Sequence, residues 1–292
     1  MNKIAVTGAN GMMGSHMISL LKSKSISTKA VTRKEWDLTK WKSLDELDHI
    51  FESVSVIFHF AAQLSYNVSK NNNQQTQKIF DTNIRSCLNL AEWAKLRKIP
   101  IVFLSSSVVY KNPHASKIIE TDPKVINGFG GFYGYTKFLA ESIFEHLSAE
   151  GLKCIILRPS SLYGYGLPSE KLVQNFINIA SSGGKIQVTD SRNRINFIHA
   201  FDVANAALKA YTNSAWGVFN ISSDTPNSIL EIAEIAVSIS KNGSLDIIDS
   251  LDNNNILRFN LNSELAKKKF GFEAKINLKE GMLLMKNKKF IP

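Results

Sequence analysis

The chain has 292 residues, of which 44% are hydrophobic and 21% charged, and this composition excludes a disordered, collagen-like or coiled-coil protein. No run of 18 apolar residues and no secretory apolar stretch occurs, so we expect a cytoplasmic protein without a membrane partner. The net charge is +10, from 35 Lys and Arg against 25 Asp and Glu. Because the C-terminal lysines lack interleaved aromatic residues, we interpret them as a solvated helix face and expect no nucleic-acid partner.

Short β-branched runs alternate with helical segments along the first two-thirds of the chain. Strands are expected at residues 3–7, 28–32, 54–60, 101–105, 152–158 and 218–222, and helices at residues 12–23, about 77–97 and 133–149. Repeated strand–helix–strand units predict an α/β fold with a doubly wound parallel (Rossmann) sheet. Further helices are expected at about residues 170–181, 228–240 and 263–270. We assign residues 1–162 and about 197–222 to a dinucleotide-binding domain, and residues 163–196 and 223–292 to a smaller α/β substrate lobe.

A glycine-rich turn, from Thr7 to Gly14, joins the first expected strand to the first helix. Gly8 permits a tight turn, Gly11 lets the backbone approach a pyrophosphate, and Gly14 lets the helix pack close to the strand. The helix N-terminus offers free N–H groups to phosphates. This position and spacing predict a dinucleotide-binding loop formed by Gly8, Asn10, Gly11, Met12 and Met13.

The end of the second expected strand bears on the choice of cofactor. NAD enzymes place a carboxylate there to accept hydrogen bonds from the ribose hydroxyls, whereas this chain has Thr32 and Arg33. Arg33 and Lys34 would complement a 2′-phosphate, which favours NADP over NAD. Glu35 lies close enough to keep NAD open, and the alternative for both cations is that they are solvated turn residues.

A serine and a tyrosine–lysine pair are the candidate catalytic groups. Ser106 follows the fourth expected strand, at the sheet edge where ligands of this fold bind. Tyr133 and Lys137 are four residues apart and share a helix face, so the ammonium group would lower the pKa of Tyr133 and also reach the cofactor ribose. Tyr133 then becomes an acid or base near neutral pH. Tyr110 and Tyr135 are alternative proton donors, although Tyr135 should point away from Lys137.

The remaining reactive residue types are interpreted as structural. Cys87 and Cys154 lie in apolar stretches without a ligand-spaced partner, so we expect no disulfide and no metal site. His59 and His199 also lie in apolar runs and are expected to be buried structural residues.

These motifs, in this order, resemble those of the extended short-chain dehydrogenase/reductases, the nucleotide-sugar epimerase/dehydratase/reductase family. Besides the glycine loop, the serine run and the Tyr133–Lys137 pair, the resemblance includes residues 58–62, the turn at residues 158–164 and the segment at residues 194–203. It covers nearly the whole chain. The resemblance implies an NAD(P)-dependent enzyme that acts on a nucleoside diphosphate-sugar as a homodimer.

The resemblance also implies residue roles. Ser106 would hydrogen-bond the reacting sugar oxygen, Tyr133 would move the proton, and Lys137 would bind the ribose. Arg194 and Arg258 would hold the substrate diphosphate, unless they are surface ion-pair residues. The implied cofactor-binding residues are Gly8, Asn10, Gly11, Met12, Met13, Thr32, Arg33, Asp37, Leu38, Phe60, Ala61, Ala62, Tyr133 and Lys137, and the implied substrate-binding residues are Ser107, Arg194 and Arg258.

Within the family, residues 32–38 are most similar to the GDP-fucose synthase group, which uses NADPH. The epimerase step of that group needs a cysteine where this chain has Val108, and a histidine that residues 165–198 do not contain. The 4,6-dehydratases of the family carry Asp-Glu where this chain has Ser107 and Val108. The resemblance therefore implies hydride transfer without dehydration and without epimerisation at carbons 3 and 5.

We accordingly expect an NADP(H)-dependent 4-ketoreductase of a nucleoside diphosphate-sugar. The alternative is a 4-epimerase that retains NAD and returns the hydride to the other face of the sugar. Arg33 favours the reductase, whereas Asn10 replaces a basic residue of the family and weakens the argument for NADP. A reductase of a non-nucleotide aldehyde or ketone would leave Arg194 without an anion, and the intact Tyr133 and Lys137 argue against a non-catalytic member.

Overall fold

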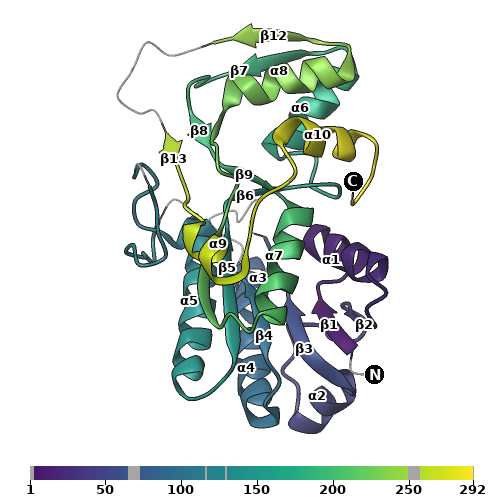
Figure 1. The fold of residues 1–292 in the computed structure, drawn as a ribbon, viewed down its shortest axis with the longest axis vertical. Coiled ribbons are helices and arrows are strands. Elements are labelled where there is room, and N and C mark those ends of the chain that lie inside the picture. The colour runs from purple at the N-terminus through teal and green to yellow at the C-terminus, as the bar shows by residue number, and fades with distance from the viewer. Residues whose placement is uncertain (1–2, 65–72, 116, 129, 249–256, 292) are drawn as a thin grey trace.

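The computed structural model describes residues 3–64, 73–115, 117–128, 130–248 and 257–291. A six-stranded sheet lies at its centre, in the order β10-β5-β4-β3-β1-β2, and every neighbouring pair is parallel (Figure 1). The strands are β1 (Lys3–Thr7), β2 (Thr28–Val31), β3 (Val54–His59), β4 (Ile101–Leu104), β5 (Cys154–Pro159) and β10 (Gly217–Ile221). The predicted doubly wound α/β fold is confirmed.

Helices cover both faces of this sheet because its buried strands carry apolar side chains on both faces. In β3, for example, Phe58 belongs to one core and Ile57 to the other. The first core lies under α1 (Met12–Ser23), α7 (Ala200–Thr212) and α9 (Glu264–Phe270). The second lies under α2 (Leu44–Ile50), α4 (Ser86–Arg97) and α5 (Gly131–Ala149).

The position of α9 differs from the expected division of the chain, which placed residues 223–292 in the smaller lobe. Ala266, Phe270 and Phe272 belong to the same core as α1 and α7. The ring of Phe270 packs edge-on against Phe219 of β10, with the ring centroids 5.1 Å apart. The chain therefore returns to the large sheet a second time, after the strand β10.

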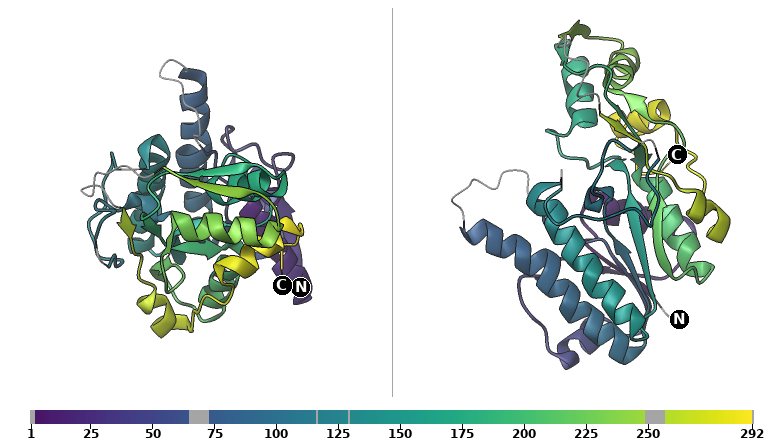
Figure 2. Two further views of the ribbon diagram at one scale, coloured as in Figure 1. Left: turned by 90° about the horizontal axis from the view of Figure 1, so that it is seen from above. Right: turned by 90° about the vertical axis from the view of Figure 1, so that its left-hand side faces the viewer.

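One continuous helical segment covers residues 73–97, where a single helix was predicted at about residues 77–97. It consists of α3 (Asn73–Phe80), a π-helical turn η1 (Asp81–Arg85) and α4, which follow each other without a break (Figure 2). π-Helical turns inside α-helices are rare and occur often at functional sites. Here the wide turn lies beside the pocket described below, because Thr82 lines that pocket.

A second, smaller core lies beyond the carboxyl edge of the large sheet (Figure 1). Its helices are α6 (Leu172–Ser181), α8 (Ile229–Ser240) and α10 (Leu278–Lys286), and β7 (Lys185–Val188) pairs in parallel with β12 (Ser244–Ile247). Short strands join the two cores: β6 (Ser161–Tyr163) pairs with β9 (Phe197–His199), and β8 (Arg194–Ile195) lies between β11 (Asn227–Ser228) and β13 (Arg258–Phe259).

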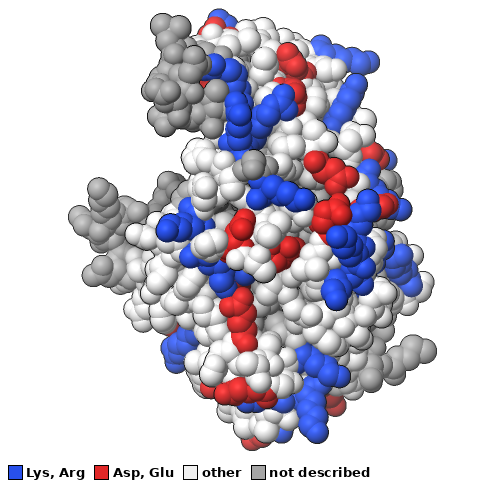
Figure 3. All heavy atoms as spheres, turned by 60° about the vertical axis from the view of Figure 1, so that its left-hand side comes forward, with Lys and Arg blue, Asp and Glu red and all other residues white. Residues whose placement is uncertain are grey.

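The surface carries charges of both signs. On the face shown in Figure 3, basic and acidic side chains are interspersed. None of the described helices is both long and apolar enough to cross a membrane. In the described part of the chain, no group of His, Cys, Asp and Glu could hold a metal ion, and Cys87 and Cys154 are buried free thiols.

Candidate active site

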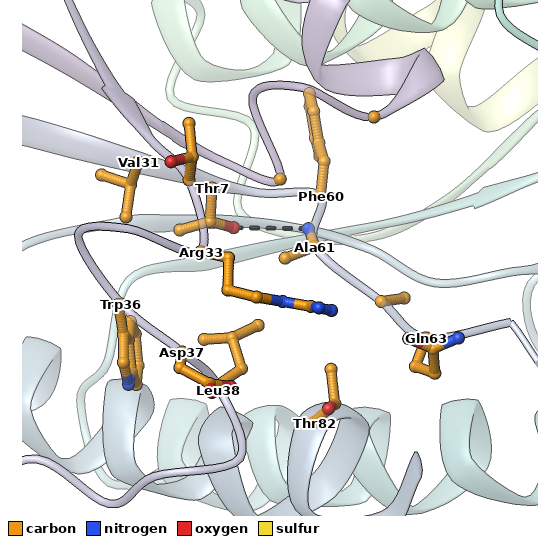
Figure 4. A pocket seen from close by; sticks show the side chains of 14 residues that line it. Thr7, Val31, Arg33, Trp36, Asp37, Leu38, Phe60, Ala61, Gln63 and Thr82 are labelled. Carbon is orange, nitrogen blue, oxygen red and sulfur yellow. Dashed lines mark hydrogen bonds between the residues drawn. The ribbon is translucent and has the colours of Figure 1, made fainter. Parts of the chain in front are cut away.

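A pocket opens at the carboxyl ends of β1 and β3, where the strand order reverses (Figure 4). Ligands of doubly wound sheets bind at such a switch point, because the loops of the two strands leave in opposite directions. The pocket encloses about 190 Å³. It is lined by the expected cofactor residues Gly8, Gly11, Thr32, Arg33, Asp37, Leu38, Phe60, Ala61 and Ala62, and also by Thr7, Val31, Trp36, Gln63 and Thr82.

The glycine loop has the shape that a dinucleotide requires. Gly8 has a φ of +66°, and a Cβ on it would lie 2.8 Å from both the nitrogen and the Cα of Ala61. A Cβ on Gly14 would lie 2.1 Å from the carbonyl oxygen of Gly8. Gly11 caps α1 without a side chain, so the first N–H groups of α1 remain available for phosphate oxygens. The loop therefore fits a pyrophosphate group.

Three loop residues expected to bind the cofactor do not line this pocket. Asn10 is exposed, and Met12 is partly buried. Met13 is 5% exposed because its side chain belongs to the core under α1. The Met13 side chain therefore packs away from the pocket, and only its backbone, in the first turn of α1, can face a phosphate.

The end of β2 presents a cation to the pocket and turns its nearest carboxylate away. One oxygen of Glu35 accepts hydrogen bonds from the amide of Thr32 at 2.7 Å and from its hydroxyl at 2.6 Å. The Thr32 hydroxyl is the main reason that the pKa of Glu35 lies below its ordinary value. Glu35 is not among the lining residues, whereas the guanidinium of Arg33 extends across the pocket (Figure 4).

The turn after Arg33 forms the outer wall of the pocket. Asp37 lines it, and one carboxylate oxygen accepts hydrogen bonds from the Thr39 amide at 3.1 Å and the Thr39 hydroxyl at 2.9 Å. Burial acts to raise the pKa of Asp37, but these bonds and the charge of Arg33 outweigh it, so the pKa is lowered. Asp37 is therefore a carboxylate acceptor fixed in place beside Arg33.

The candidate catalytic serine lies in a tight turn against α5. Ser106 caps a 3-10 turn (Ser107–Val109), and its hydroxyl accepts from the Val108 amide at 3.4 Å. A Cβ on Gly130 would lie 2.7 Å from the Cβ of Val108, and a Cβ on Gly134 would lie 3.4 Å from the Val108 carbonyl oxygen. The serine turn and the first turn of α5 are thus in contact. Ser107, expected to bind substrate, is only 5% exposed.

Lys137 is buried beside Tyr133, as their spacing predicts. Its Nζ lies 5.8 Å from the centroid of the Tyr133 ring and 4.8 Å from that of Phe103. The ammonium donates a hydrogen bond to the carbonyl oxygen of Leu104 at 2.6 Å. Burial lowers the pKa of Lys137 to about 8, against the opposing effect of Cys87 and Glu141. Tyr133 therefore has a cation on its own helix face.

The two alternative tyrosines have other surroundings. The hydroxyl of Tyr110 donates to Asn220 at 2.6 Å and accepts from Arg158 at 2.9 Å. Burial raises the pKa of Tyr110 to about 12, which makes it a poor acid or base near neutral pH. Tyr135 packs its ring against Phe132 with the centroids 5.6 Å apart. The hydroxyl of Tyr110 is therefore already engaged by two buried partners.

A buried ion pair fixes α5 on the sheet. Arg158 of β5 is 2% exposed and reaches Glu141 of α5 through two nitrogens, Nε at 3.0 Å and Nη2 at 2.8 Å. Such a bidentate pair holds a defined geometry. Because Glu141 lies one helical turn beyond Lys137, the pair sets the height of the helix that carries Tyr133 and Lys137 relative to β5.

Arg194 and Arg258 are adjacent on a small sheet outside the pocket. They are register partners in the parallel strands β8 and β13, and both are exposed. Arg194 donates to the carbonyl oxygen of Pro226 at 3.1 Å and pairs with Glu231 at 3.2 Å. The structure brings the two arginines together. Arg194 also forms a surface ion pair, as expected if it were only a surface ion-pair residue.

Some pocket residues have no signature in the sequence. Trp36 is 2% exposed and donates from its indole nitrogen to the Lys40 carbonyl at 3.1 Å, which closes the turn after β2. Gln63 and Thr82 line the pocket from segments of mixed polar and apolar residues, in which neither side chain stands out. The one signal that could have indicated Gln63 is a polar residue in the loop that follows a buried strand, here β3, which ends at His59.

The chain is similar to known proteins over most of its length. The model of the NAD dependent epimerase/dehydratase family matches residues 4–222. UDP-glucuronic acid decarboxylase 6 of Arabidopsis thaliana is 26% identical over 306 aligned positions, which cover 97% of this chain and 87% of that protein.

Two solved structures share the fold. UDP-glucose 4-epimerase of Thermus thermophilus in complex with NAD superimposes with a TM-score of 0.82 at 19% identity, over 98% of each chain. RMD of Pseudomonas aeruginosa in complex with NADPH has a TM-score of 0.82 at 20% identity, over 99% of this chain and 98% of that one. The resemblance inferred from the sequence is confirmed by the family match, and the chain belongs to the NAD dependent epimerase/dehydratase family of enzymes.

Proposed function

We propose that the enzyme is an NADPH-dependent 4-ketoreductase of a nucleoside diphosphate-sugar. The observation that carries the proposal is the guanidinium of Arg33, which extends across the pocket at the end of β2, while Glu35 is held by Thr32 (Figure 4). A ribose 2′-phosphate carries about two negative charges, and a planar guanidinium is the best protein partner for it. A free 2′-hydroxyl, in contrast, needs the carboxylate that this strand end directs elsewhere.

The proposed chemistry uses three side chains. The bound cofactor supplies the hydride that reduces the keto carbon. Tyr133 donates a proton to the oxygen that becomes the alcohol, and the hydroxyl of Ser106 hydrogen-bonds the same oxygen. Lys137 keeps a positive charge on the Tyr133 side of the helix, which favours the phenolate left after proton transfer.

The proposed substrate follows from the paired arginines and from the relatives. Arg194 and Arg258 lie side by side, as two cations for a diphosphate should. The exposed pair between Arg194 and Glu231 costs little to break, because surface ion pairs contribute about 0–1 kcal/mol. The curated relative and the epimerase are both named for UDP-linked sugars, which supports a nucleotide-linked substrate here.

The serine turn supports reduction over dehydration or epimerisation at carbons 3 and 5. Both of these reactions need a further acid or base, which the family resemblance places at positions 107 and 108, directly after Ser106. The second of these side chains is Val108, packed against Gly130 and Gly134, and it can neither donate nor accept a proton. Proton transfer is left to Tyr133 alone.

A 4-epimerase that retains NAD is the second candidate. The observation that favours it is Asp37, a carboxylate in the lining of the same pocket. Hydride removal and return at carbon 4 needs no residues beyond those of the reductase, so the catalytic groups do not separate the two reactions.

The cofactor separates the two proposals. Native mass spectrometry of the purified enzyme shows which dinucleotide co-purifies, and fluorescence titration compares NADPH with NADH. The reductase predicts tighter binding of NADPH and a site that exchanges cofactor freely. Stoichiometric bound NAD, or equal affinity for the two cofactors, would replace the reductase by the epimerase. Light scattering on the same samples tests the predicted homodimer.

A further inference from the structure

A buried chain of hydrogen bonds starts at the wall of the cofactor pocket. The amide of Ala61 donates to Oγ1 of Thr7 at 3.3 Å, and that hydroxyl lies 2.9 Å from Nδ1 of His59. On the other side of the ring, Nε2 of His59 lies 3.6 Å from Sγ of Cys87. The Cys87 thiol donates to the carbonyl oxygen of Asn83 at 3.1 Å. These hydrogen bonds thus connect the sheet edge to the π-helical turn.

The donor and acceptor of each hydrogen bond in this series can be assigned in one consistent way. The single hydrogen of Cys87 goes to Asn83, so Sγ accepts from Nε2, which must carry the ring hydrogen of His59. Nδ1 is then an acceptor, and the hydroxyl of Thr7 donates to it while accepting from Ala61. Burial lowers the pKa of His59 to about 3, with a smaller contribution from Lys137, and raises that of Cys87 to about 12, so both groups are neutral.

A second arm continues from Asn83 to the catalytic helix. Oδ1 of Asn83 accepts from the amide of Gln63 at 2.7 Å, and Nδ2 donates to the Gln63 carbonyl at 2.9 Å. Nδ2 also donates to the hydroxyl of Thr136 at 3.1 Å, and Thr136 donates to the carbonyl oxygen of Tyr133 at 2.8 Å. One residue of the π-helical turn therefore joins the pocket wall to the first turn of α5.

This network has the properties of a positioning device. Its polar side chains are at most 3% exposed: Thr7, His59, Cys87, Asn83 and Thr136. Packing alone would be served by apolar residues, whereas a buried polar network that is fully satisfied specifies one arrangement of the backbone around it. The elements that it joins are the wall at residues 61–63 and the helix that carries Tyr133 and Lys137.

We propose that His59 and Cys87 are positioning residues, which act through Asn83 to hold the cofactor-lining backbone and the first turn of the Tyr133 helix in one fixed relation. The inference rests on dinucleotide binding in this pocket, which is part of the proposed function. Neither side chain is placed to touch the reacting atoms. Their effect is on where Ala61, Gln63 and Tyr133 lie.

The two cysteines of the chain offer a matched test. Cys87→Ala removes the link, Cys87→Ser restores a donor and an acceptor, and Cys154→Ala makes a similar cavity outside the network. Fluorescence titration with NADPH and with NADH, together with thermal unfolding, is measured for each. We expect both alanine variants to melt earlier, but only Cys87→Ala to bind the cofactor more weakly, by about five- to tenfold, the effect of one lost hydrogen bond. Cys87→Ser should recover most of that affinity.

A second pair covers the case in which Cys87→Ala does not fold. Thr136→Val keeps the shape of the side chain but breaks the arm to Tyr133, and Thr136→Ser keeps the hydroxyl. Thr136 does not line the pocket, so weaker cofactor binding by the valine variant alone would support the network. Equal binding by Cys87→Ala and Cys154→Ala, or no recovery in Cys87→Ser, would overturn it. A wild-type enzyme that binds neither cofactor would instead overturn the assignment of the pocket, and the network proposal with it.

Discussion

The residues proposed for hydride transfer lie inside the large sheet domain, whereas the residues proposed for the substrate diphosphate lie on the surface of a small sheet. Lys137 is 4% exposed and donates to a backbone carbonyl, and the helix around it is held by the Arg158–Glu141 pair. The side chain of Arg194 is 49% exposed, and its ionic partner Glu231 is 39% exposed. The comparison indicates that burial fixes the groups proposed for catalysis, whereas the arginines proposed for the diphosphate lie on exposed strands, where ion pairs are weak and easily exchanged.

The largest expected effect breaks the buried side of this comparison. Tyr133→Phe removes the proposed acid and keeps the ring, so turnover should fall by about 10²–10⁴-fold. Cofactor affinity should be nearly unchanged, because Lys137 remains. Tyr135→Phe is the control, and its turnover should match that of the wild type. Steady-state rates with a keto-sugar substrate check this, and a phenylalanine variant that keeps more than about a tenth of the rate would show that another group moves the proton.

Lys137→Met should abolish turnover and weaken cofactor binding, yet near neutral pH it should leave the fold at least as stable as the wild type, with a net gain of about 0–2 kcal/mol. The pKa of Lys137 is about 8 in the folded protein against an ordinary value of 10.5, so burying the charged form costs about 3 kcal/mol below pH 8. In the variant the buried carbonyl of Leu104 loses its hydrogen-bond donor. This loss destabilises the fold by about 1–3 kcal/mol and offsets part or all of the gain. Chemical denaturation at pH 7 measures the difference.

The pH dependence of that difference has a definite sign. Between the folded pKa of about 8 and the unfolded value of 10.5, the unfolded wild type binds more protons than the folded one, so its stability rises with pH. Methionine does not titrate. The advantage of Lys137→Met should therefore shrink by about 2 kcal/mol between pH 7 and pH 9.5. A constant difference across this range would show that folding does not lower the pKa of Lys137.

A smaller effect sharpens the cofactor part of the buried site. Arg33→Ala should weaken NADPH binding by about 1.5–3 kcal/mol, the value of a charged hydrogen bond to phosphate, and leave NADH binding nearly unchanged. Lys34→Ala is the control, because Lys34 is the adjacent cation and does not line the pocket. Titration of both cofactors against both variants checks the prediction. If Arg33→Ala weakened the two cofactors equally, Arg33 would not be recognising a 2′-phosphate.

The smallest effect concerns the exposed side. Arg194→Ala should raise the KM for a nucleoside diphosphate-sugar about tenfold with little change in kcat, because the lost contact is made equally in the ground state and the transition state. Lys185→Ala, on the outer strand β7, is the control. Steady-state kinetics with the nucleotide-linked sugar and the free sugar measure both parameters. Equal turnover of free and nucleotide-linked sugars by the wild type would contradict the diphosphate role.

The sequence predicted the large sheet well because its signals are local. Each parallel strand reads as a short β-branched run, and β1 and α1 begin and end where the pattern places them. The roles of Gly8 and Gly14 were also predictable from their spacing between a strand and a helix. The structure shows that a side chain at either position would collide with backbone atoms. The pair Tyr133 and Lys137 follows from helical spacing alone.

What the sequence did not show depends on contacts between distant segments. The network through His59, Cys87 and Asn83 joins a strand end to a π-helical turn, and each residue by itself looks like ordinary core. The docking of α9 on the large sheet depends on Phe270 meeting Phe219, which no pattern within one helix records. The burial of Met13 and Ser107, expected to contact ligands, likewise depends on neighbours from other elements.

The most direct test of the proposed function follows a single hydride. Purified enzyme, NADPH deuterated at the transferable position and a nucleoside diphosphate 4-keto-sugar are incubated, and the product is examined by mass spectrometry and NMR. We predict one deuterium at carbon 4 of the product and one NADP⁺ formed for each sugar reduced. Interconversion of two sugars without added cofactor and without deuterium uptake would contradict the reductase and identify the 4-epimerase.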